Sequence, residues 1–345
     1  MYTSGTSGQP KGVLHAQRTV LGRIPMQKGW TDFQSTDRVC HAGHLNWSYT
    51  LGVGLMDSWV AGATSVLYGG EKNPQIWVSL LQKQKITIFA AVPSLYRQIL
   101  KYSSEQDWKL PHLRHALSAG ETLPKNILQQ WYEQTGTYLY EALGMTEIST
   151  YISTSPHMLI KSGSVGKPQV GRKVRILPMN TTDKEVAPKE IGLLAVHRSD
   201  LGLMLGYWNR EEEEKKMFRG EWFVGGDLAS MDEDGYIWYQ GRNNELMNAF
   251  GYRVSPIEVE NTLRKHPDIL DVAVTEVRIS EQISLIGAFV ILQEDKKLSN
   301  TALKKWSLEK MADYKCPKEF WFVSQFPRTA NGKLIRKKLP TLLPN

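Results

Sequence analysis

Cysteine is scarce in this sequence, and the two that occur, Cys40 and Cys316, lie far apart along the chain. A disulfide framework and a CxxC metal site are therefore both excluded, and the reducing cytoplasm is the compartment that we expect. The sequence also lacks any apolar run of about 18 residues, and it does not begin with the pattern of a signal peptide. We therefore expect a soluble protein with no membrane span.

The sequence lacks the clustered basic surface that nucleic-acid binding requires. It has 42 Lys and Arg against 35 Asp and Glu, a formal net charge of +7, and the basic residues are scattered, with their densest run at 333–338. This balance suits anionic ligands such as nucleotides, and it is equally typical of a soluble surface. We therefore expect small-molecule partners and no nucleic acid.

The chain has 345 residues, of which 41% are hydrophobic, so it can form two units with separate cores. Up to about residue 162, short apolar runs alternate with helical patterns, and this predicts an α/β region with a largely parallel sheet. The predicted strands and helices there are 64–67, 75–84, 86–92 and 94–102. From about 163 to 243, short strands and glycine-rich turns predict a β-rich subdomain.

Residues 1–243 together form the predicted large domain, and residues 244–345 form a small α+β domain. A helix is predicted at 256–265 and another one ends at Met311, with strands at 270–277 and 286–292 between them. The fold class predicted for the whole chain is therefore α/β, with a small second domain.

The segment from Tyr2 to Gly12 reads Tyr-Thr-Ser-Gly-Thr-Ser-Gly-Gln-Pro-Lys-Gly. Its backbone N–H groups and side-chain hydroxyls can surround phosphate oxygens, and Lys11 adds a positive charge. It is not the Walker pattern, in which the lysine is followed by serine or threonine. Its composition is also typical of a flexible linker, but the Pro-Lys-Gly ending favours a phosphate-binding loop.

Further motifs follow this loop in order along the chain. They are Ser118-Ala119-Gly120-Glu121, Gly144-Met145-Thr146-Glu147, Gly163–Pro168, Gly226-Asp227, Gly241-Arg242 and Pro327–Lys333. With the loop, they resemble the adenylate-forming superfamily of acyl-CoA synthetases, firefly luciferase and the adenylation domains of nonribosomal peptide synthetases. The resemblance implies an acid–thiol ligase that forms an acyl-adenylate and then a thioester, with ATP, Mg²⁺ and coenzyme A.

The resemblance also implies which residues hold ATP. The phosphate loop contributes Thr3, Ser4, Gly5, Thr6, Ser7, Gly8 and Lys11. The adenine is expected to lie between two segments, Gly120, Glu121 and Thr122 on one side and Glu141, Ala142, Leu143 and Gly144 on the other. Many relatives have tyrosine at the position of Leu143, so stacking on the base is replaced here by apolar contact.

Thr146 and Glu147 are expected to end a strand, where a hydroxyl and a carboxylate become available together. By resemblance, Thr146 contacts the α-phosphate and Glu147 binds Mg²⁺, a cation that prefers oxygen ligands. A Thr-Glu pair alone is more often the start of a capped helix. Asp227 is expected at a strand end, where the resemblance implies that it binds the ribose hydroxyls, and Arg242 is expected to contact the ribose and phosphate.

Lys333 is the residue that the resemblance assigns to the first chemical step, because a positioned ammonium stabilises the charge that gathers on the α-phosphate. The segment that contains Gly251, Tyr252 and Arg253 resembles the one that lines the coenzyme A tunnel. Asn244 matches the pivot of the mobile C-terminal domain, a position that is commonly Asp or Lys in relatives.

For the acyl pocket we expect Trp47, Tyr49 and Gly52, which match the region where benzoate-type ligases contact the acid. Aromatic residues at such spacing are also typical of an ordinary core. The substrate implied by the closest resemblance, to the benzoate-CoA ligase and medium-chain branch, is an aromatic or medium-chain acid.

Relatives carry an N-terminal portion before the phosphate loop, which this sequence lacks. We therefore expect exposed sheet edges and apolar faces, and either self-association or a complementing N-terminal segment. Two other functions stay open at this point. The chain could load its acid onto a carrier protein, or it could be an inactive nucleotide-binding fragment.

Overall fold

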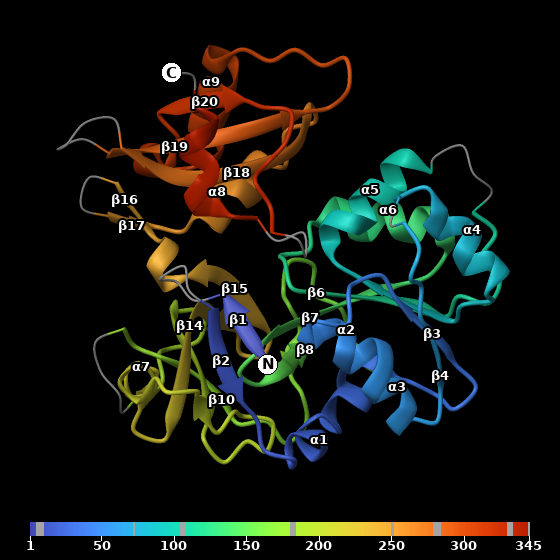
Figure 1. Cartoon of the computed structure of the whole chain (residues 1–345). Helices are drawn as coiled ribbons and strands as arrows, with labels where there is room; N and C mark the ends of the chain where they lie inside the picture. Colours follow the sequence, from blue (N-terminus) through green and yellow to red (C-terminus); the bar gives the residue numbers. More distant parts are fainter. Residues whose placement is uncertain are drawn as a thin grey trace. The chain divides into compact units, whose positions relative to one another are not determined.

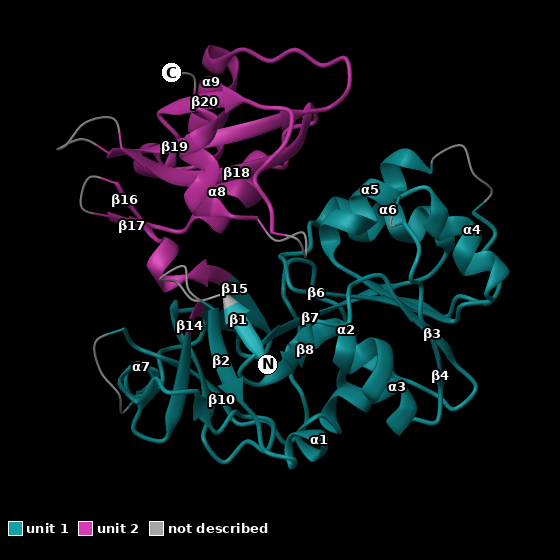
Figure 2. Ribbon diagram, viewed as in Figure 1, with its two compact units in different colours: residues 1–225, 229–239 teal, residues 226–228, 240–345 magenta. Residues whose placement is uncertain are grey.

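The computed structural model describes residues 1–4, 10–71, 73–103, 108–179, 184–249, 252–278, 284–329 and 334–343. The chain divides into two compact units, which Figure 2 shows in different colours. Unit 1 comprises residues 1–225 and 229–239, and unit 2 comprises residues 226–228 and 240–345. Two strands contribute to both units, β14 (Trp222–Met231) and β15 (Ile237–Arg242).

The described residues of unit 1 form a seven-stranded sheet with the order β4-β3-β5-β6-β7-β8-β9 (Figure 1). The pairs from β4 to β7 are parallel, and β8 and β9 add to them in antiparallel fashion. The bounds are β3 Arg38–His41, β4 Thr64–Val66, β5 Ile88–Ala91, β6 His115–Ala119, β7 Leu139–Met145, β8 Ser149–Ser153 and β9 Lys167–Pro168. Parallel strands place their carboxyl ends at one edge, so the segments that follow β6 and β7 are neighbours.

Both faces of this sheet are buried, because successive side chains of a strand point to opposite sides. Cys40 and Phe89 pack on one face, whereas their chain neighbours Val39 and Ile88 pack on the other. The first face is covered by α4 (Ile76–Lys83), α5 (Pro93–Tyr102) and α6 (Lys125–Thr135). The second face is covered by η1 (Gln27–Thr31), α2 (Ser48–Leu51) and η2 (Gly52–Met56), beside the short helices α1 (Thr19–Gly22) and α3 (Asp57–Val60).

The β-rich part of the chain pairs strands β10-β11-β14-β13, with β15 on β14. The remaining bounds here are β10 Val174–Leu177, β11 Gly192–His197, β12 Gly206–Tyr207, α7 Glu211–Lys215 and β13 Phe218–Arg219. A separate small sheet has the order β1-β2-β12, where β1 is Tyr2–Ser4 and β2 is Pro10–Leu14. A shared core that includes Val13, Ile148 and Tyr207 joins this sheet to the turn after β7.

Unit 2 contains the hairpin β16 (Met247–Ala249) and β17 (Tyr252–Val254) and the sheet β18-β19-β20. The other bounds are η3 Asn243–Glu245, α8 Pro256–Leu263, β18 Ile269–Arg278, β19 Ser284–Leu292, α9 Asn300–Lys310, η4 Asp313–Lys315, β20 Glu319–Phe322 and η5 Arg336–Leu342. Helices α8 and α9 cover one face of the sheet, and η5 packs on the other face through Leu339.

The predicted α/β class, with a largely parallel sheet, a β-rich part and an α+β region, is confirmed by this architecture. One local prediction is wrong. Asp227 was expected at a strand end, but it lies inside β14, which continues to Met231. The preceding Gly226 has a φ of +84°, a value that glycine adopts readily, so the strand passes the two glycines without ending.

Candidate functional site

The small sheet β1-β2-β12 positions the phosphate-loop residues that lie in the described part of the chain. Thr3 pairs with Lys11, and Ser4 pairs with Pro10, across the β1–β2 hairpin. On its other side β2 pairs with β12, which places Tyr207 opposite Val13. The rest of the predicted loop, Gly5, Thr6, Ser7 and Gly8, lies outside the described residues.

Thr146 and Glu147 lie in the turn that follows β7, and three contacts hold this turn. His15 Nε2 lies 2.8 Å from the Thr146 carbonyl oxygen, and the Met204 amide donates to the Glu147 carbonyl oxygen at 2.7 Å. The Tyr207 hydroxyl donates to Glu147 Oε1 at 2.7 Å. Glu147 is buried, with 9% of the residue exposed, and the hydrogen bond from Tyr207 orients its carboxylate.

Lys11 forms an ion pair with Glu213 of α7, and its Nζ lies 5.3 Å from the centre of the Tyr207 ring. Arg210 shares the same glutamate, with Nη1 2.5 Å from Glu213 Oε1. The hydrogen bond from Lys11, followed by the one from Arg210, lowers the pKa of the Glu213 carboxyl. One aromatic ring therefore contacts both the lysine of the phosphate loop and the carboxylate of the β7 turn.

His15 is a half-buried base beside this turn. Burial lowers the pKa of its imidazole, and the hydrogen bond with the Thr146 carbonyl opposes that change. The neutral ring donates through one nitrogen, so His15 anchors the backbone of the turn and adds no charge to it.

The two segments predicted to flank an adenine do lie at neighbouring strand ends. Ala119 pairs with Ala142, so Gly120, Glu121 and Thr122 follow β6 beside the end of β7, which carries Glu141, Ala142, Leu143 and Gly144. The Ser94 amide donates to Glu121 Oε2 at 3.1 Å. Gly144 packs so closely on Ser149 and Thr150 that an added Cβ would lie within 3.0 Å of their backbone.

Glu141 is a buried carboxyl on β7. The Leu123 amide donates to Glu141 Oε1 at 3.1 Å, and the Glu141 backbone amide donates to Thr154 Oγ1 at 2.8 Å. Burial raises the pKa of Glu141 to about 8. The carboxyl is therefore mostly protonated at neutral pH and offers a hydrogen-bond donor as well as an acceptor.

Replacing Glu141 by glutamine is expected to stabilise unit 1 at high pH. The pKa is raised from 4.5 to about 8 on folding, so the folded chain binds more protons between these values, and stability falls as pH rises through that window. The free energy of unfolding of Glu141→Gln should exceed that of the wild type by roughly 1–3 kcal/mol at pH 8, and the two should be nearly equal at pH 4.5. Calorimetry at both pH values measures it.

The control for this prediction is Glu133→Gln, which removes an exposed carboxylate from α6. Surface changes of this kind shift stability by at most about 0.5 kcal/mol, so its melting temperature should match the wild type at both pH values. An equal gain for Glu141→Gln at pH 4.5 and pH 8 would contradict the assignment of a protonated carboxyl.

The predicted acyl-pocket residues belong to an aromatic cluster on the second face of the sheet. The Tyr49 ring lies 5.3 Å from Trp47 and 4.2 Å from His41, both edge-on, and 5.8 Å from Trp30. Burial raises the pKa of the Tyr49 phenol well above its ordinary value, and the hydroxyl donates to the Leu117 carbonyl at 3.3 Å. Gly52 packs against the Arg23 guanidinium, where a Cβ would clash.

Asp227 and Arg242 form an ion pair within unit 2, with Arg242 Nε 3.0 Å from Asp227 Oδ1. Asp227 is buried, and Arg242 is partly exposed at the end of β15. A carboxylate and a guanidinium that already pair with each other form a ready set of acceptor and donor groups for a ribose phosphate.

Two of the three residues predicted for coenzyme A, Tyr252 and Arg253, lie on β17, and Gly251 lies outside the described residues. Tyr252 is 56% exposed, and its ring lies 4.5 Å from that of Tyr314 at an angle of 30°. Lys315 Nζ lies 5.6 Å from the Tyr314 ring and pairs with Glu258 at 2.5 Å. The sequence analysis did not identify Tyr314 or Lys315.

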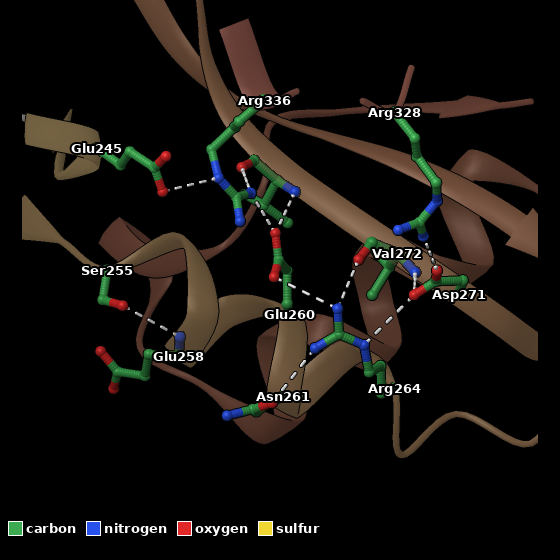
Figure 3. A network of polar contacts seen from close by, with 11 residues as sticks. Glu245, Ser255, Glu258, Glu260, Asn261, Arg264, Asp271, Val272, Arg328 and Arg336 are labelled. Carbon is green, nitrogen blue, oxygen red and sulfur yellow. Dashed lines mark hydrogen bonds and ion pairs between the residues drawn. The ribbon is translucent and has the colours of Figure 1, made fainter. Parts of the chain in front are cut away.

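Asn244 lies in η3, and the next residue, Glu245, belongs to a polar network of unit 2 (Figure 3). Arg336 donates to Glu260, to the Val274 carbonyl and, through Nε, to Glu245 Oε2 at 3.3 Å. Glu260 is buried, yet it has partners for both oxygens, because Arg264 lies 3.4 Å from Oε2. The residue after the predicted pivot is thus tied to the body of unit 2.

Lys333 lies outside the described residues, but both flanks of its segment are described. Arg328 pairs with Leu334 as a β-bridge, and the Ile335 amide donates to the Pro327 carbonyl at 2.8 Å. Arg328 Nη2 also lies 3.4 Å from Asp271 Oδ2 (Figure 3). In the described flanks, Arg328 pairs with the buried Asp271 and Arg336 pairs with the buried Glu260.

The comparisons identify the family. A family model described as "AMP-binding enzyme" matches residues 1–208, and a second, "AMP-binding enzyme C-terminal domain", matches residues 258–333. The chain belongs to the AMP-binding enzyme family. The resemblance inferred from the motifs is thereby confirmed.

Individual AMP-binding enzymes resemble almost the whole chain. An uncharacterized acyl-CoA ligase, YtcI of Bacillus subtilis, is 33% identical over 98% of this chain and 64% of its own length. The acetyl-coenzyme A synthetase of the same organism is 31% identical over 98% of this chain and 60% of its own length. The anthranilate CoA ligase AuaEII, solved with anthranoyl-AMP, superposes with a TM-score of 0.86 at 32% identity and covers 99% of this chain.

The chain thus spans less than two thirds of the length of these AMP-binding relatives, 60% and 64% for the two Bacillus proteins. Their names cover acyl, acetyl and anthranilate substrates, so likeness at this level defines a family and leaves the acid open. ATP, Mg²⁺ and coenzyme A are the reactants and cofactors that this family uses.

The candidate site offers few metal-ligating side chains among the described residues. The described residues contain no group of three or more His, Cys, Asp or Glu side chains that could hold a metal ion. One carboxylate with a nearby hydroxyl fits Mg²⁺, which keeps water and phosphate oxygens as most of its ligands. A carboxylate can accept from tyrosine through one oxygen and bind a cation through the other. None of the described helices is long and apolar enough to cross a bilayer.

Three residues around the β7 turn of this AMP-binding enzyme were missed by the sequence analysis: Tyr207, His15 and Glu213. Their contacts join segments about 60 to 200 residues apart, and β12, which carries Tyr207, has only two residues. A two-residue strand has no periodicity to detect.

Proposed function

We propose that the protein joins a carboxylic acid to coenzyme A at the expense of ATP. A carboxylate oxygen of the acid bonds to the α-phosphorus of ATP as the bond to the pyrophosphate oxygen breaks, and pyrophosphate leaves. The coenzyme A thiolate then adds to the acyl carbonyl, and AMP leaves as the thioester forms. The thiol proton passes to solvent.

The observation that carries this proposal is the turn after β7. It presents Thr146 and a buried Glu147, in a chain of the AMP-binding family, and Tyr207, which donates to Glu147, also contacts Lys11 through its ring. Thr146 would donate to the α-phosphate, Glu147 would hold Mg²⁺, and Lys11 would contact the other phosphates. Bound Mg²⁺ would neutralise negative charge on the phosphates. Positioning and charge neutralisation would account for most of the rate.

The remaining ATP contacts are proposed for the other motifs. Residues 120–122 and 141–144 would flank the adenine, and Asp227 and Arg242 would bind the ribose. The remaining residues of the phosphate loop, Thr3 to Gly8, would surround the phosphates. Lys333 would stabilise the negative charge of the first transition state.

Coenzyme A is favoured over a carrier protein as the acceptor. Its adenine can stack on an exposed aromatic pair, and its phosphates attract cations, whereas the phosphopantetheine of a carrier has no base. Tyr252 and Tyr314 form such a pair, and Lys315 lies beside it. We propose that Gly251, Tyr252 and Arg253 form part of the acceptor site.

An aromatic or medium-chain acid is proposed as the substrate. The cluster of Trp47, Tyr49 and Trp30 offers apolar and aromatic surface, Gly52 begins the adjacent turn η2, and one similar enzyme is an anthranilate ligase. We also propose a pivot at Asn244, between domains 1–243 and 244–345, for the change from the first step to the second. The cytoplasm is the proposed compartment, because Cys40 and Cys316 are buried thiols.

To test this proposal, the purified chain is incubated with MgATP, coenzyme A and a panel of benzoates and short to medium-chain fatty acids. Mass spectrometry should detect an acyl-adenylate and an acyl-CoA from one class of acid. A parallel reaction offers a phosphopantetheinylated carrier protein in place of coenzyme A.

Transfer to the carrier but not to coenzyme A would overturn the acceptor. Binding of ATP without product from any acid would instead support the inactive-fragment reading. In that case, activity regained on adding an N-terminal segment from a relative would indicate the complementing partner, and a concentration-dependent mass in solution would indicate self-association.

A further inference from the structure

Tyr207 lies at the centre of the contacts around the β7 turn. Its residue is only 5% exposed, and it is fixed by pairing with Val13 of β2. The hydroxyl reaches Glu147 Oε1 at 2.7 Å, while the ring lies 5.3 Å from Lys11 Nζ. A single side chain thus contacts both groups that the proposed function assigns to MgATP.

The Tyr207 hydroxyl has a role that packing in the core does not require. Tyr207 packs among apolar residues such as Val13, Ile148 and Phe223, where phenylalanine would fit equally well. A buried carboxylate, however, needs donors, and among the hydrogen bonds described here the Tyr207 hydroxyl is the donor to the Glu147 side chain. That bond fixes one oxygen of the carboxylate and so sets the direction in which the other points.

The backbone around Glu147 is held by independent contacts. The Met204 amide and His15 bind the carbonyls of Glu147 and Thr146, so the turn keeps its path when the Tyr207 hydroxyl is removed. The ion pair of Lys11 with Glu213 does not depend on that hydroxyl either. Among the described contacts, loss of the hydroxyl therefore removes the bond that orients the Glu147 carboxylate and leaves the contacts of the surrounding backbone in place.

We propose that Tyr207 is a positioning residue that orients Glu147 for Mg²⁺ in the MgATP complex. The inference rests on the proposed function, and it adds a residue that acts through Glu147 and does not touch the reacting atoms. Hydrogen-bond partners of this kind typically change metal affinity by about 10-fold when they are removed.

The test is Tyr207→Phe in the full chain, with ATP binding followed by isothermal titration calorimetry. In Mg²⁺ the dissociation constant should rise about 10-fold, and in EDTA it should equal that of the wild type. In ATP–pyrophosphate exchange, the Mg²⁺ concentration for half-maximal rate should rise by a similar factor, while the rate at saturating Mg²⁺ falls by less than about threefold.

Tyr236→Phe is the matched control, because it also removes a buried tyrosine hydroxyl of unit 1, one that donates to the Leu159 carbonyl at 2.5 Å. Its Mg²⁺ dependence should equal that of the wild type. Equal Mg²⁺ dependence in Tyr207→Phe, or an equal loss of ATP binding with and without Mg²⁺, would overturn the inference. A wild-type chain that binds no MgATP would instead overturn the proposed function itself.

Discussion

Replacement of Lys333 by alanine is expected to lower the rate of acyl-adenylate formation by about 10²–10³-fold. The first step concentrates negative charge on the α-phosphate, and a positioned ammonium in a water-poor site lowers that barrier. In the described flanks of this segment, Arg328 pairs with Asp271 and Arg336 pairs with Glu260 (Figure 3). ATP–pyrophosphate exchange measures this step.

Measuring the second step, thioester formation, distinguishes a chemical role of Lys333 in adenylation from a structural role. The thiolate attacks the acyl carbonyl and AMP leaves with its bonds to phosphorus intact, so no pentavalent phosphate forms in this step. Thioester formation from supplied acyl-adenylate should therefore change by less than about threefold. Lys338→Ala, which removes an exposed lysine of the same basic run, should leave both steps unchanged. Equal loss of both steps in Lys333→Ala would contradict a specific role in adenylation.

Replacement of Gly166 by alanine is expected to destabilise unit 1 by about 3–5 kcal/mol. Gly166 has a φ of +97°, and a Cβ there would lie far closer than 3.0 Å to the Ser153 carbonyl and the Thr154 amide. The obstacle is backbone, so it cannot move aside as a side chain would. The clash would separate β9 from β8, where Ser153 pairs with Lys167.

Gly171→Ala provides the comparison for this prediction. Gly171 has a φ of +88°, but nothing lies within 4 Å of an added Cβ, so its replacement costs only the backbone strain of about 1–2 kcal/mol. Calorimetric melting of both variants separates the two contributions. Equal melting temperatures would contradict a steric cause at Gly166.

Local patterns explain why the elements of the sheet could be predicted. The helix expected at 94–102 is observed as Pro93–Tyr102, and the strand expected at 86–92 is observed as Ile88–Ala91. The helix expected at 256–265 begins at Pro256, where Ser255 Oγ accepts from the Glu258 amide at 3.3 Å. In each case residues close in sequence specify the element through periodicity, capping or proline.

The contacts that arrange the site could not be predicted in the same way. The motifs indicated Thr146, Glu147 and Lys11, but not that Tyr207 connects them, because that depends on pairing between β2 and β12. Arg336 lies in a basic run that reads as solvated surface, yet it is buried against Glu260. Both features result from tertiary packing, which a single sequence does not encode in any short window.

The pairing of β2 with β12 also has a consequence for the order of folding. Val13 and Tyr207 are neighbours in space but are separated by most of unit 1 in sequence. Contacts of such high sequence separation form late, because the intervening chain must first be closed into a loop. During synthesis from the N-terminus, β2 therefore lacks its partner β12 until that strand has emerged from the ribosome. The nucleotide site would be among the last parts of unit 1 to form.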